Sequence, residues 1–361
     1  MSEQNARNNC ILSILFFLVF FPAHVFGQRI NFAEYEVSTA TYYGEADWLV
    51  AHRDEFQNQF STELQKIKRI ELLQHEISPE EIAFWARCKN VVDIQIGELP
   101  DALSLSSTSA EQLRNFESIE SLNLCLSDVA DEDVLFLANM PKPLKSLSIE
   151  CAFSGLGPIG QRSLGLTDAS GKVFNKIEKL EQLTIRGTDF SDQFLAHIAQ
   201  LPNLRKLDIG GKFSQGGLSH LKELGNLTEL RISGSQPWNQ AALLHLKDAK
   251  SLVCLDICVD GTFRNLGAIA QLKSLRHLTI TGKVDVTDFA MFAENSSLET
   301  VSLIGESNFD KNFNVFQAMP KLKTVSFSSG PVETIKFRRG TLKRRVEGEL
   351  KGDTHTSEAT R

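Results

Sequence analysis

Four residues of the types that bind zinc lie close together in the sequence. They are Cys254, Asp256, Cys258 and His277. Thiolate, imidazole and carboxylate groups are the usual zinc ligands. If residues 254–258 form one extended strand, a rise of about 3.3 Å per residue separates the two cysteines by roughly 13 Å. Zinc–sulfur bonds are only about 2.3 Å long, so both thiols could bind one ion only if the strand bent sharply. We therefore expect no metal and no cofactor here.

Two further patterns resemble chemical motifs. Residues 155–160 match the G-x-G-x-x-G of dinucleotide-binding proteins, but that motif needs a strand before it and a helix after it. No helical pattern follows directly, so a glycine-rich loop is predicted. His197, His220 and His245 occupy one repeated sequence position and are interpreted as a polar position on helices. Because no catalytic set of residues can be placed, the chain is predicted not to be an enzyme.

Charged residues of alternating sign are the remaining candidates for chemistry. They are Lys206, Asp208, Glu229, Arg231 and Asp256. These side chains could form a row of ion pairs, each worth about 0–1 kcal/mol when exposed, or a polar patch that binds a partner. Both readings require that the segments carrying them are neighbouring strands.

A repeated pattern predicts such strands. Eleven times the chain places apolar residues with the spacing of Leu227, Leu230 and Ile232. The first members are Ile67, Val91, Ile119, Leu144, Leu180, Leu204, Leu227, Leu252, Leu275, Leu298 and Leu322. Their spacing of 23 to 36 residues is typical of a solenoid. The Leu-x-x-Leu-x-Leu core resembles that of the leucine-rich repeat family. The resemblance implies an α/β solenoid, a curved horseshoe with a parallel sheet on its concave side.

Each strand is expected to show one set of positions to a ligand. With the first apolar residue of each triplet as position one, positions three, five and seven lie on the concave face, because side chains alternate along a strand. The candidate binding residues at these positions are Lys206, Asp208, Glu229, Arg231, Cys254, Asp256 and His277. No aromatic residue occupies these positions. Since aromatic residues dominate many binding hot spots, we expect this face alone to bind proteins less tightly than a typical horseshoe.

The segments between triplets are expected to return along the convex side, often as helices. Ser78-Pro79-Glu80-Glu81 predicts a helix start, with an N-cap serine, a proline and a glutamate three residues after the cap. Position nine, where the family usually has asparagine, never carries it here. The turns must therefore be satisfied in another way.

The flanking segments set the domain limits. Residues 28–66 are predicted as a lead-in and an amphipathic capping helix, and residues 67–330 as the repeat domain. An insertion is expected near residues 153–176, where one repeat is longer than the others. Residues 331–361 are predicted as a capping strand followed by a basic, polar, disordered tail.

The N-terminus resembles an export signal. Residues 11–21 form an apolar run that Pro22 ends, too short for a spanning helix of ~20 residues. We predict a signal peptide over residues 1–27, cleaved between Gly27 and Gln28, with an uncleaved anchor as the alternative. After cleavage no transmembrane segment is expected, and the protein would be secreted, periplasmic or envelope-associated.

Two cysteines raise the question of a disulfide. Cys125 and Cys151 fall at positions seven and eight of adjacent repeats, roughly one strand spacing apart. A bridge between them is one alternative. The preferred interpretation is that they are small, buried or half-buried apolar residues.

The charge is unevenly distributed. Residues 331–361 carry a net charge of +3 and the rest of the chain −10, which argues against nucleic acid as a partner. The favoured hypothesis is an exported, non-catalytic leucine-rich repeat protein that binds a protein or other cell-surface ligand. The alternative is a structural or envelope-associated scaffold that docks on a surface or polymer through its convex face or basic tail. The sequence leaves the ligand and the oligomeric state open.

Overall fold

The computed structural model describes most of the repeat region. The described residues are 39–42, 61–73, 77–97, 105–127, 129–140, 144–151, 165–214, 216–234, 243–263, 266–293, 297–305, 313–328, 333–338 and 341–346. The expected signal peptide with its Gly27–Gln28 cleavage site, most of the expected capping helix and the first part of the insertion lie outside them. Within these ranges no helix is long and apolar enough to cross a membrane. The chain divides into two compact units, Met1–Lys212 and Phe213–Arg361.

The first unit is a parallel sheet whose strands follow one another in sequence order. Its strands are β1 (Thr39–Tyr42), β2 (Arg69–Leu72), β3 (Asp93–Ile96), β4 (Ser121–Leu126), β5 (Ser146–Cys151), β6 (Gln182–Phe190) and β7 (Lys206–Gly211). Its helical segments are α3 (Ser61–Leu64), α4 (Pro79–Trp85), α5 (Ser107–Gln112), η3 (Leu113–Asn115), η4 (Asp131–Asn139), α6 (Ser170–Phe174) and α7 (Asp192–Ile198). The sheet begins one strand before the first triplet, because part of the expected lead-in forms β1 and pairs with β2.

The second unit continues the pattern and then departs from it. Its strands are β8 (Glu229–Gly234), β9 (Cys254–Phe263), β10 (His277–Val284), β11 (Thr300–Ile304), β12 (Thr324–Ser328), β13 (Glu333–Arg338) and β14 (Thr341–Val346). Its helical segments are η5 (Gly217–Glu223), η6 (His245–Asp248), α9 (Gly267–Ala270), η7 (Val286–Phe292) and η8 (Phe313–Ala318). Strands β8 to β12 are parallel, whereas β13 and β14 pair antiparallel. The sequence predicted one capping strand before a disordered tail; the structure has a second strand in that segment.

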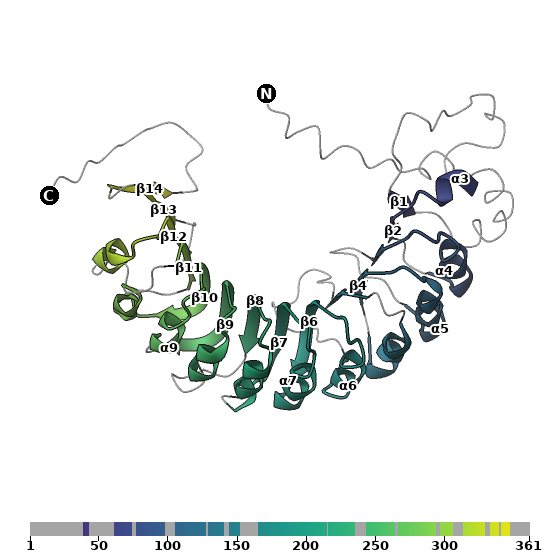
Figure 1. Cartoon of the computed structure of the whole chain (residues 1–361), viewed down its shortest axis with the longest axis horizontal. Coiled ribbons are helices and arrows are strands. Elements are labelled where there is room, and N and C mark those ends of the chain that lie inside the picture. The colour runs from purple at the N-terminus through teal and green to yellow at the C-terminus, as the bar shows by residue number, and fades with distance from the viewer. Residues whose placement is uncertain are drawn as a thin grey trace, which may run out of the picture. The chain divides into compact units, whose positions relative to one another are not determined.

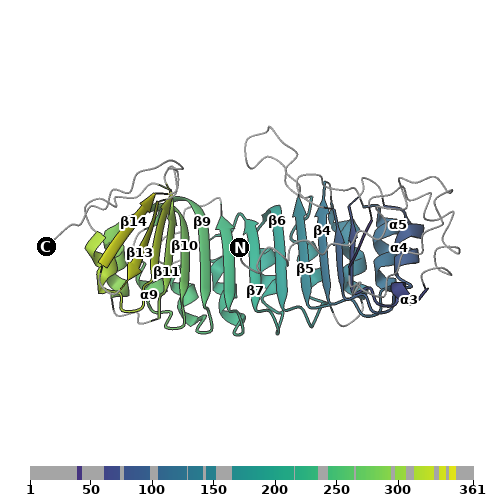
Figure 2. The ribbon, with the colours of Figure 1, turned by 90° about the horizontal axis from the view of Figure 1, so that it is seen from above.

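Strands and short helices alternate in both units, which is the α/β leucine-rich-repeat arrangement. The helices lie on one face of each unit's sheet and leave the other face without helices (Figures 1 and 2). We call the latter the helix-free face. Many returning segments are 3-10 turns, because a repeat of this length leaves few residues for the return and short helices tolerate the tighter winding.

The core lies between the sheet and the helices. The triplet positions are buried in every described repeat; Leu204, Leu207 and Ile209, for example, are at most 2% exposed. Equivalent positions of neighbouring strands are in register, so the apolar residues stack from repeat to repeat. Phenylalanines of the returning segments fill the other side of the core, as where the rings of Phe190 and Phe194 stack 3.6 Å apart. This continuous burial is what stabilises a solenoid.

Main-chain hydrogen bonds lock the start of each strand to the preceding repeat. The carbonyl of Glu120 accepts from the N–H groups of both Lys145 and Ser146, at 2.8 and 2.9 Å. The residue at position two does the same in other repeats of both units. These shared acceptors satisfy the backbone N–H groups of positions two and three at the start of the strands.

Asparagine does bridge repeats, but at a different position from the one expected. The amide nitrogen of Asn90 donates to the carbonyl of Gln65 at 2.6 Å, and that of Asn203 to the carbonyl of Glu178 at 2.9 Å. Both asparagines directly precede position one of a triplet. The amides therefore tie together the helix-to-strand turns rather than the strand-to-helix turns.

Carboxylates support the turns into two later helices. Asp168 accepts from the backbone N–H of Ser191 at 2.8 Å and from its hydroxyl. Asp131 accepts from the backbone N–H of Thr167 at 2.9 Å and from its hydroxyl. The helix start predicted at Ser78 is confirmed, since its hydroxyl accepts from the N–H of Glu81 at 3.1 Å.

Candidate binding surface

The predicted rows of side chains exist within the second unit. Ladder pairing aligns Glu229 with Cys254 and Arg231 with Asp256. It then aligns Cys254 with His277. All five residues are half-buried or exposed, as expected on a face that no helix covers. Strands β8, β9 and β10 thus bring together five of the seven candidate binding residues.

The expected charge row includes an ion pair between Arg231 and Asp256. The guanidinium Nε of Arg231 donates to Oδ2 of Asp256 at 2.7 Å, with side-chain exposures of 54% and 22%. An exposed pair of this kind contributes about 0–1 kcal/mol. On the same face, Nδ1 of His277 lies 2.8 Å from the hydroxyl of Thr300. The surface therefore offers a charged pair, an imidazole and hydroxyl groups to a partner.

Lys206 and Asp208 belong to the first unit. They lie on β7, in register with Gln182 and Thr184. Lys206 is exposed and Asp208 half-buried. The sequence predicts that Lys206 neighbours Glu229 and that Asp208 neighbours Arg231 on β8. Both pairings stay predictions.

The cysteines of this face are half-buried and are not bridged. Cys254 and Cys258 are both on β9, and neither is part of a disulfide. No cluster of three or more His, Cys, Asp or Glu side chains converges as metal ligands anywhere in the described ranges. Cys125 is buried and is not part of a disulfide, and the ladder aligns Cys151 with Leu126 rather than with Cys125.

A charge network that the sequence analysis did not single out lies at the start of the first unit. Arg69 donates through Nε to Glu71 at 2.8 Å, through Nη1 to Asp93 at 2.5 Å and through Nη2 to Gln95 at 2.8 Å. Burial lowers the pKa of the guanidinium, but the hydrogen bond to Glu71 and the charges of Asp93 and Glu71 outweigh it, so the pKa is raised. The sequence already contained the clue to this network, because all four residues occupy positions three and five of the first two repeats.

A second row of charges runs along the strand starts, outside the candidate face. The Nζ atom of Lys145 lies 3.0 Å from Oε2 of Glu120. In the second unit Glu299 lies 3.8 Å from Arg276 and also pairs with Lys323. The hydrogen bond from Lys323 lowers the pKa of Glu299, and the charges of Lys323 and Arg276 act in the same direction. All three residues of this cluster occupy position two.

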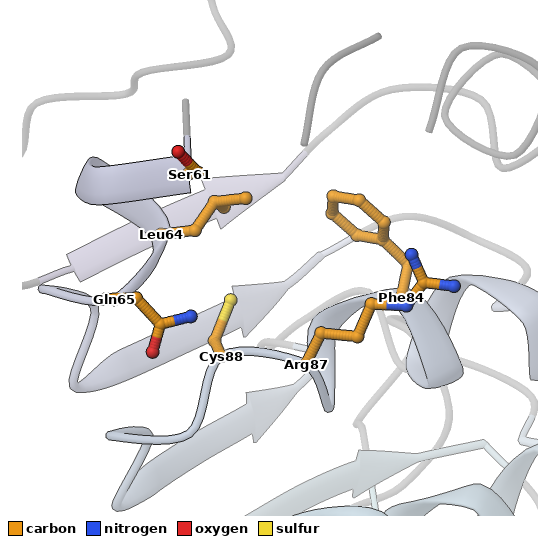
Figure 3. A pocket seen from close by; sticks show the side chains of 6 residues that line it. All are labelled: Ser61, Leu64, Gln65, Phe84, Arg87 and Cys88. Atoms are coloured by element: carbon orange, nitrogen blue, oxygen red, sulfur yellow. The ribbon is translucent and has the colours of Figure 1, made fainter. Parts of the chain in front are cut away.

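A small pocket lies between α3 and α4 (Figure 3). Its lining is Ser61, Leu64, Gln65, Phe84, Arg87 and Cys88. Its volume of about 40 Å³ is far below the roughly 300–1,000 Å³ of small-molecule sites. Burial raises the pKa of the Cys88 thiol to about 12, and since the thiolate is the reactive form, this group is a poor nucleophile at neutral pH. The pocket is not a candidate active site.

His197 lies where two consecutive helices approach closely. His197 lies in α7, and a Cβ added at Gly171 of α6 would come 2.9 Å from the Cβ of His197. The glycine thus permits close approach of two consecutive helices. This contact concerns His197 alone, and the interpretation of the histidine column stays a prediction.

Comparison with known proteins gave similar structures but no similar sequence families. No protein-family model matches the chain, and no curated protein matches it. A crystal structure of an internalin from Listeria monocytogenes is 16% identical, with a TM-score of 0.47, and the match covers 73% of this chain and 68% of that one. An internalin C2 from the same species is 18% identical, with a TM-score of 0.36, and the match covers 67% of this chain and 83% of that one.

The fold itself is evident from the chain's own architecture. Buried triplets recur at a regular spacing, parallel strands align them in register, and a short helix or 3-10 turn returns behind the sheet in most repeats. Those are the defining features of a leucine-rich-repeat solenoid. The chain is a leucine-rich-repeat protein in fold.

Proposed function

We propose that this chain is an exported, non-catalytic protein that binds a protein partner through the helix-free face of β8, β9 and β10. The observation that carries the proposal is the grouping of Glu229, Arg231, Cys254, Asp256 and His277 on three adjacent strands. Parallel strands about 4.8 Å apart hold these side chains in a fixed array, which favours recognition of a partner with complementary charges and hydrogen-bonding groups.

The non-catalytic part of the proposal rests on the chemistry of the side chains. Arg231 and Asp256 neutralise each other, and His277 bonds a threonine hydroxyl. A general base or nucleophile needs a partner that activates it and a site for substrate beside it. The candidate face supplies a rigid polar surface instead.

Lys206 and Asp208 on β7 are proposed as further contacts that belong to the first unit. They occupy positions three and five, as Glu229 and Arg231 do on β8. Variants that change only Lys206 and Asp208, or only the residues of the second unit, would separate the two contributions to partner binding.

The test is affinity capture from the native secretome with three forms of the full-length chain. The parent is compared with R231A/D256A/H277A and with a control, K247A/K250A, whose lysines are exposed outside the strands. We expect one partner that the parent and the control capture and the face variant loses at least tenfold. If every captured protein is retained equally by the face variant, the proposal is wrong.

The alternative function, a scaffold that docks on a surface through the basic C-terminal segment, is favoured by a different observation. That observation is the antiparallel hairpin of β13 and β14, which carries most of the basic residues of that segment.

A further inference from the structure

Strands of the second unit begin at turns that share one backbone pattern. The N–H of Leu252 donates to the carbonyl of Ala249 at 3.1 Å, and that of Leu275 to the carbonyl of Leu272 at 3.1 Å. The turn of residues 319–322 has the same bond at 3.4 Å. A hydrogen bond between the first and fourth residues closes a β-turn. These turns lie at the edge of the sheet where the strand arrows begin (Figure 2).

Burial decides which way the side chains of these turns point. The first and last residues of each turn are buried: Ala249, Leu252, Leu272, Leu275, Met319 and Leu322. The two central residues of each turn are exposed: Lys250, Ser251, Lys273, Ser274, Pro320 and Lys321. Because the ends of each turn are anchored in the core, its centre projects into solvent. Each of the three turns therefore presents one lysine at the same edge of the sheet.

Two further cations follow directly at position two of their repeats. Arg276 and Lys323 are both exposed. The N–H of Glu299 donates to the carbonyl of Arg276, and the N–H of Lys323 to the carbonyl of Glu299, each at 2.8 Å. These bonds stack the strand starts of three consecutive repeats. We call five residues the basic edge: Lys250, Lys273, Arg276, Lys321 and Lys323.

The basic edge concentrates positive charge in an acidic chain. The four segments that lead into β9 to β12 contain five basic residues and one acidic residue, a net charge of +4: residues 249–253, 272–276, 295–299 and 319–323. The whole chain carries −7, so the remainder carries −11. Positions seven to eleven of the same four repeats, at the other ends of the strands, carry −2. The two edges of this part of the sheet therefore differ in charge.

Ion pairs neutralise only part of the basic edge. Glu299 lies 3.8 Å from Arg276 and also pairs with Lys323, so one carboxylate serves two cations. In the part of the chain that the structure describes, Lys250, Lys273 and Lys321 form no ion pair. The edge therefore has more cations than carboxylates to neutralise them.

Helix dipoles do not account for these cations. Lysine is favoured in the last turn of a helix, where aligned peptide dipoles leave a partial negative charge. The segments before Lys250 and Lys273 are η6 and α9, of four residues each, which align few peptides. Arg276 and Lys323 stand at strand starts, beyond any helix end. An external anion explains the cations of the edge better.

We propose that the basic edge binds a linear acidic polysaccharide that lies across the strand starts. The cations follow the stacking direction of strands about 4.8 Å apart, in a row one turn wide, which suits a linear polymer. The exposed hydroxyls of Ser251 and Ser274 lie next to Lys250 and Lys273 in sequence. Hydroxyl groups both donate and accept hydrogen bonds. The edge is therefore complementary to a polymer that carries both carboxylates and hydroxyls.

The charge of the remainder favours contact at this edge. A net −11 outside the four segments repels a polyanion from most of the chain, while the basic edge attracts it. The basic edge shares no residue with the candidate face of β8, β9 and β10. Polysaccharide binding is therefore independent of the partner-binding role proposed for that face.

The test measures binding of full-length chains to immobilised polygalacturonate, a linear polymer of uronate sugars, by biolayer interferometry. Fully methyl-esterified polygalacturonate is the reference, because it keeps the hydroxyls and loses the charge. The edge variant is K273Q/K321Q. The control variant is K212Q/K283Q, which removes the same charge at position nine of two repeats, where strands lead into returning segments.

An exposed charge contact strengthens binding up to about fivefold. We therefore expect K273Q/K321Q to bind polygalacturonate about tenfold more weakly than the parent, and the control to bind less than about twofold more weakly. High salt should weaken the binding of the parent, because the attraction is screened. None of the chains should bind the methyl-esterified polymer.

A third variant, E299Q, should strengthen binding. It removes the carboxylate that Arg276 and Lys323 share and leaves both cations for the polymer. We expect at least a twofold increase in affinity for polygalacturonate. Misfolding cannot produce such a gain, so this variant tests the edge even if K273Q/K321Q is less stable than the parent.

Several outcomes would overturn the proposal. An equal loss of binding in K273Q/K321Q and K212Q/K283Q would mean that only the net charge of the chain matters. Unchanged or weaker binding of E299Q would remove the basic edge from the contact. Equal binding to the methyl-esterified polymer would show that charge is not recognised. Binding to polyphosphate or to anionic vesicles without binding to polygalacturonate would make the ligand class wrong.

Discussion

Gly305 lies where two neighbouring repeats approach closely. Its φ is +123°, and a Cβ added there would come 2.6 Å from the carbonyl oxygen of Gly282. Gly282 itself has a φ of 144°. Backbone atoms cannot swing aside as a flexible side chain can, so both the conformation and the contact demand glycine.

Gly305→Ala is therefore expected to cost about 3 kcal/mol in the free energy of unfolding, from backbone strain and overpacking together. Urea unfolding followed by circular dichroism measures it. Gly225→Ala is the matched control, since a Cβ there meets nothing within 4 Å, and it should change stability by less than about 0.5 kcal/mol. Equal effects of the two substitutions would contradict the close approach.

Glu299 provides a pH prediction at the same scale. The hydrogen bond from Lys323 holds the pKa of Glu299 below its ordinary value of 4.5. Because the folded-state pKa is lowered, the pair stabilises the protein above the unfolded-state pKa and loses that contribution as pH falls through the folded-state pKa. Lys323→Met should raise the pKa of Glu299 in an NMR titration. A pKa that does not move would show that the ion pair is not formed in solution.

At the scale of elements, the guanidinium of Arg69 on β2 connects the polar side chains of β2 and β3. Arg69 neutralises Glu71 and Asp93 and also bonds Gln95. Its removal leaves two carboxylates near each other on adjacent strands. The guanidinium of Arg231 is more exposed than that of Arg69, with 54% against 39% of the side chain accessible, so water screens its pairing with Asp256 more strongly.

Arg69→Met is expected to destabilise the protein by about 1–2 kcal/mol, discounted for the partial exposure of the side chain. Arg231→Met should cost less than about 1 kcal/mol. Thermal unfolding of both variants beside the parent makes the comparison. The Arg69 variant should regain part of its stability in high salt, because the carboxylate repulsion is screened. If Arg231→Met lost more stability than Arg69→Met, the network of Arg69 would not be the more stabilising of the two.

At the scale of the whole molecule, repeats contact chiefly their sequence neighbours. The strands pair in sequence order within each unit. A perturbation should therefore remain near its source, because the stability of a solenoid is close to a sum of repeat and neighbour terms.

Hydrogen exchange tests this locality. In Gly305→Ala, amides of β10 to β12 should exchange faster, by at least tenfold, while those of β3 to β5 keep their parental rates. Mass spectrometry of peptic fragments resolves the two regions. Uniform acceleration across the chain would mean that the protein unfolds as a single cooperative body.

Export also concerns the whole molecule and makes a separate prediction. Secretion of the full-length chain from an export-competent bacterial host should give a mature protein that begins at Gln28, as intact-mass measurement would show. A protein that retains residues 1–27 in the membrane fraction would favour the uncleaved anchor.

The repeat architecture and the buried core could be predicted from the sequence. Apolar residues with the spacing of Leu204, Leu207 and Ile209 face one side of a strand whatever surrounds them, since alternation is a local property of extended backbone. The rows on the helix-free face followed from the same rule, and the structure confirms those of β8, β9 and β10.

Only the tertiary structure decided which polar groups meet. Arg69 reaches Asp93 and Gln95 across a strand boundary, and Asn203 reaches the carbonyl of Glu178, 25 residues earlier in the chain. The antiparallel pairing of β13 with β14 was also not evident from the spacing of apolar residues. Such pairings depend on the register between segments and on side-chain rotamers. The spacing of apolar residues, by contrast, records only which side of each strand is buried.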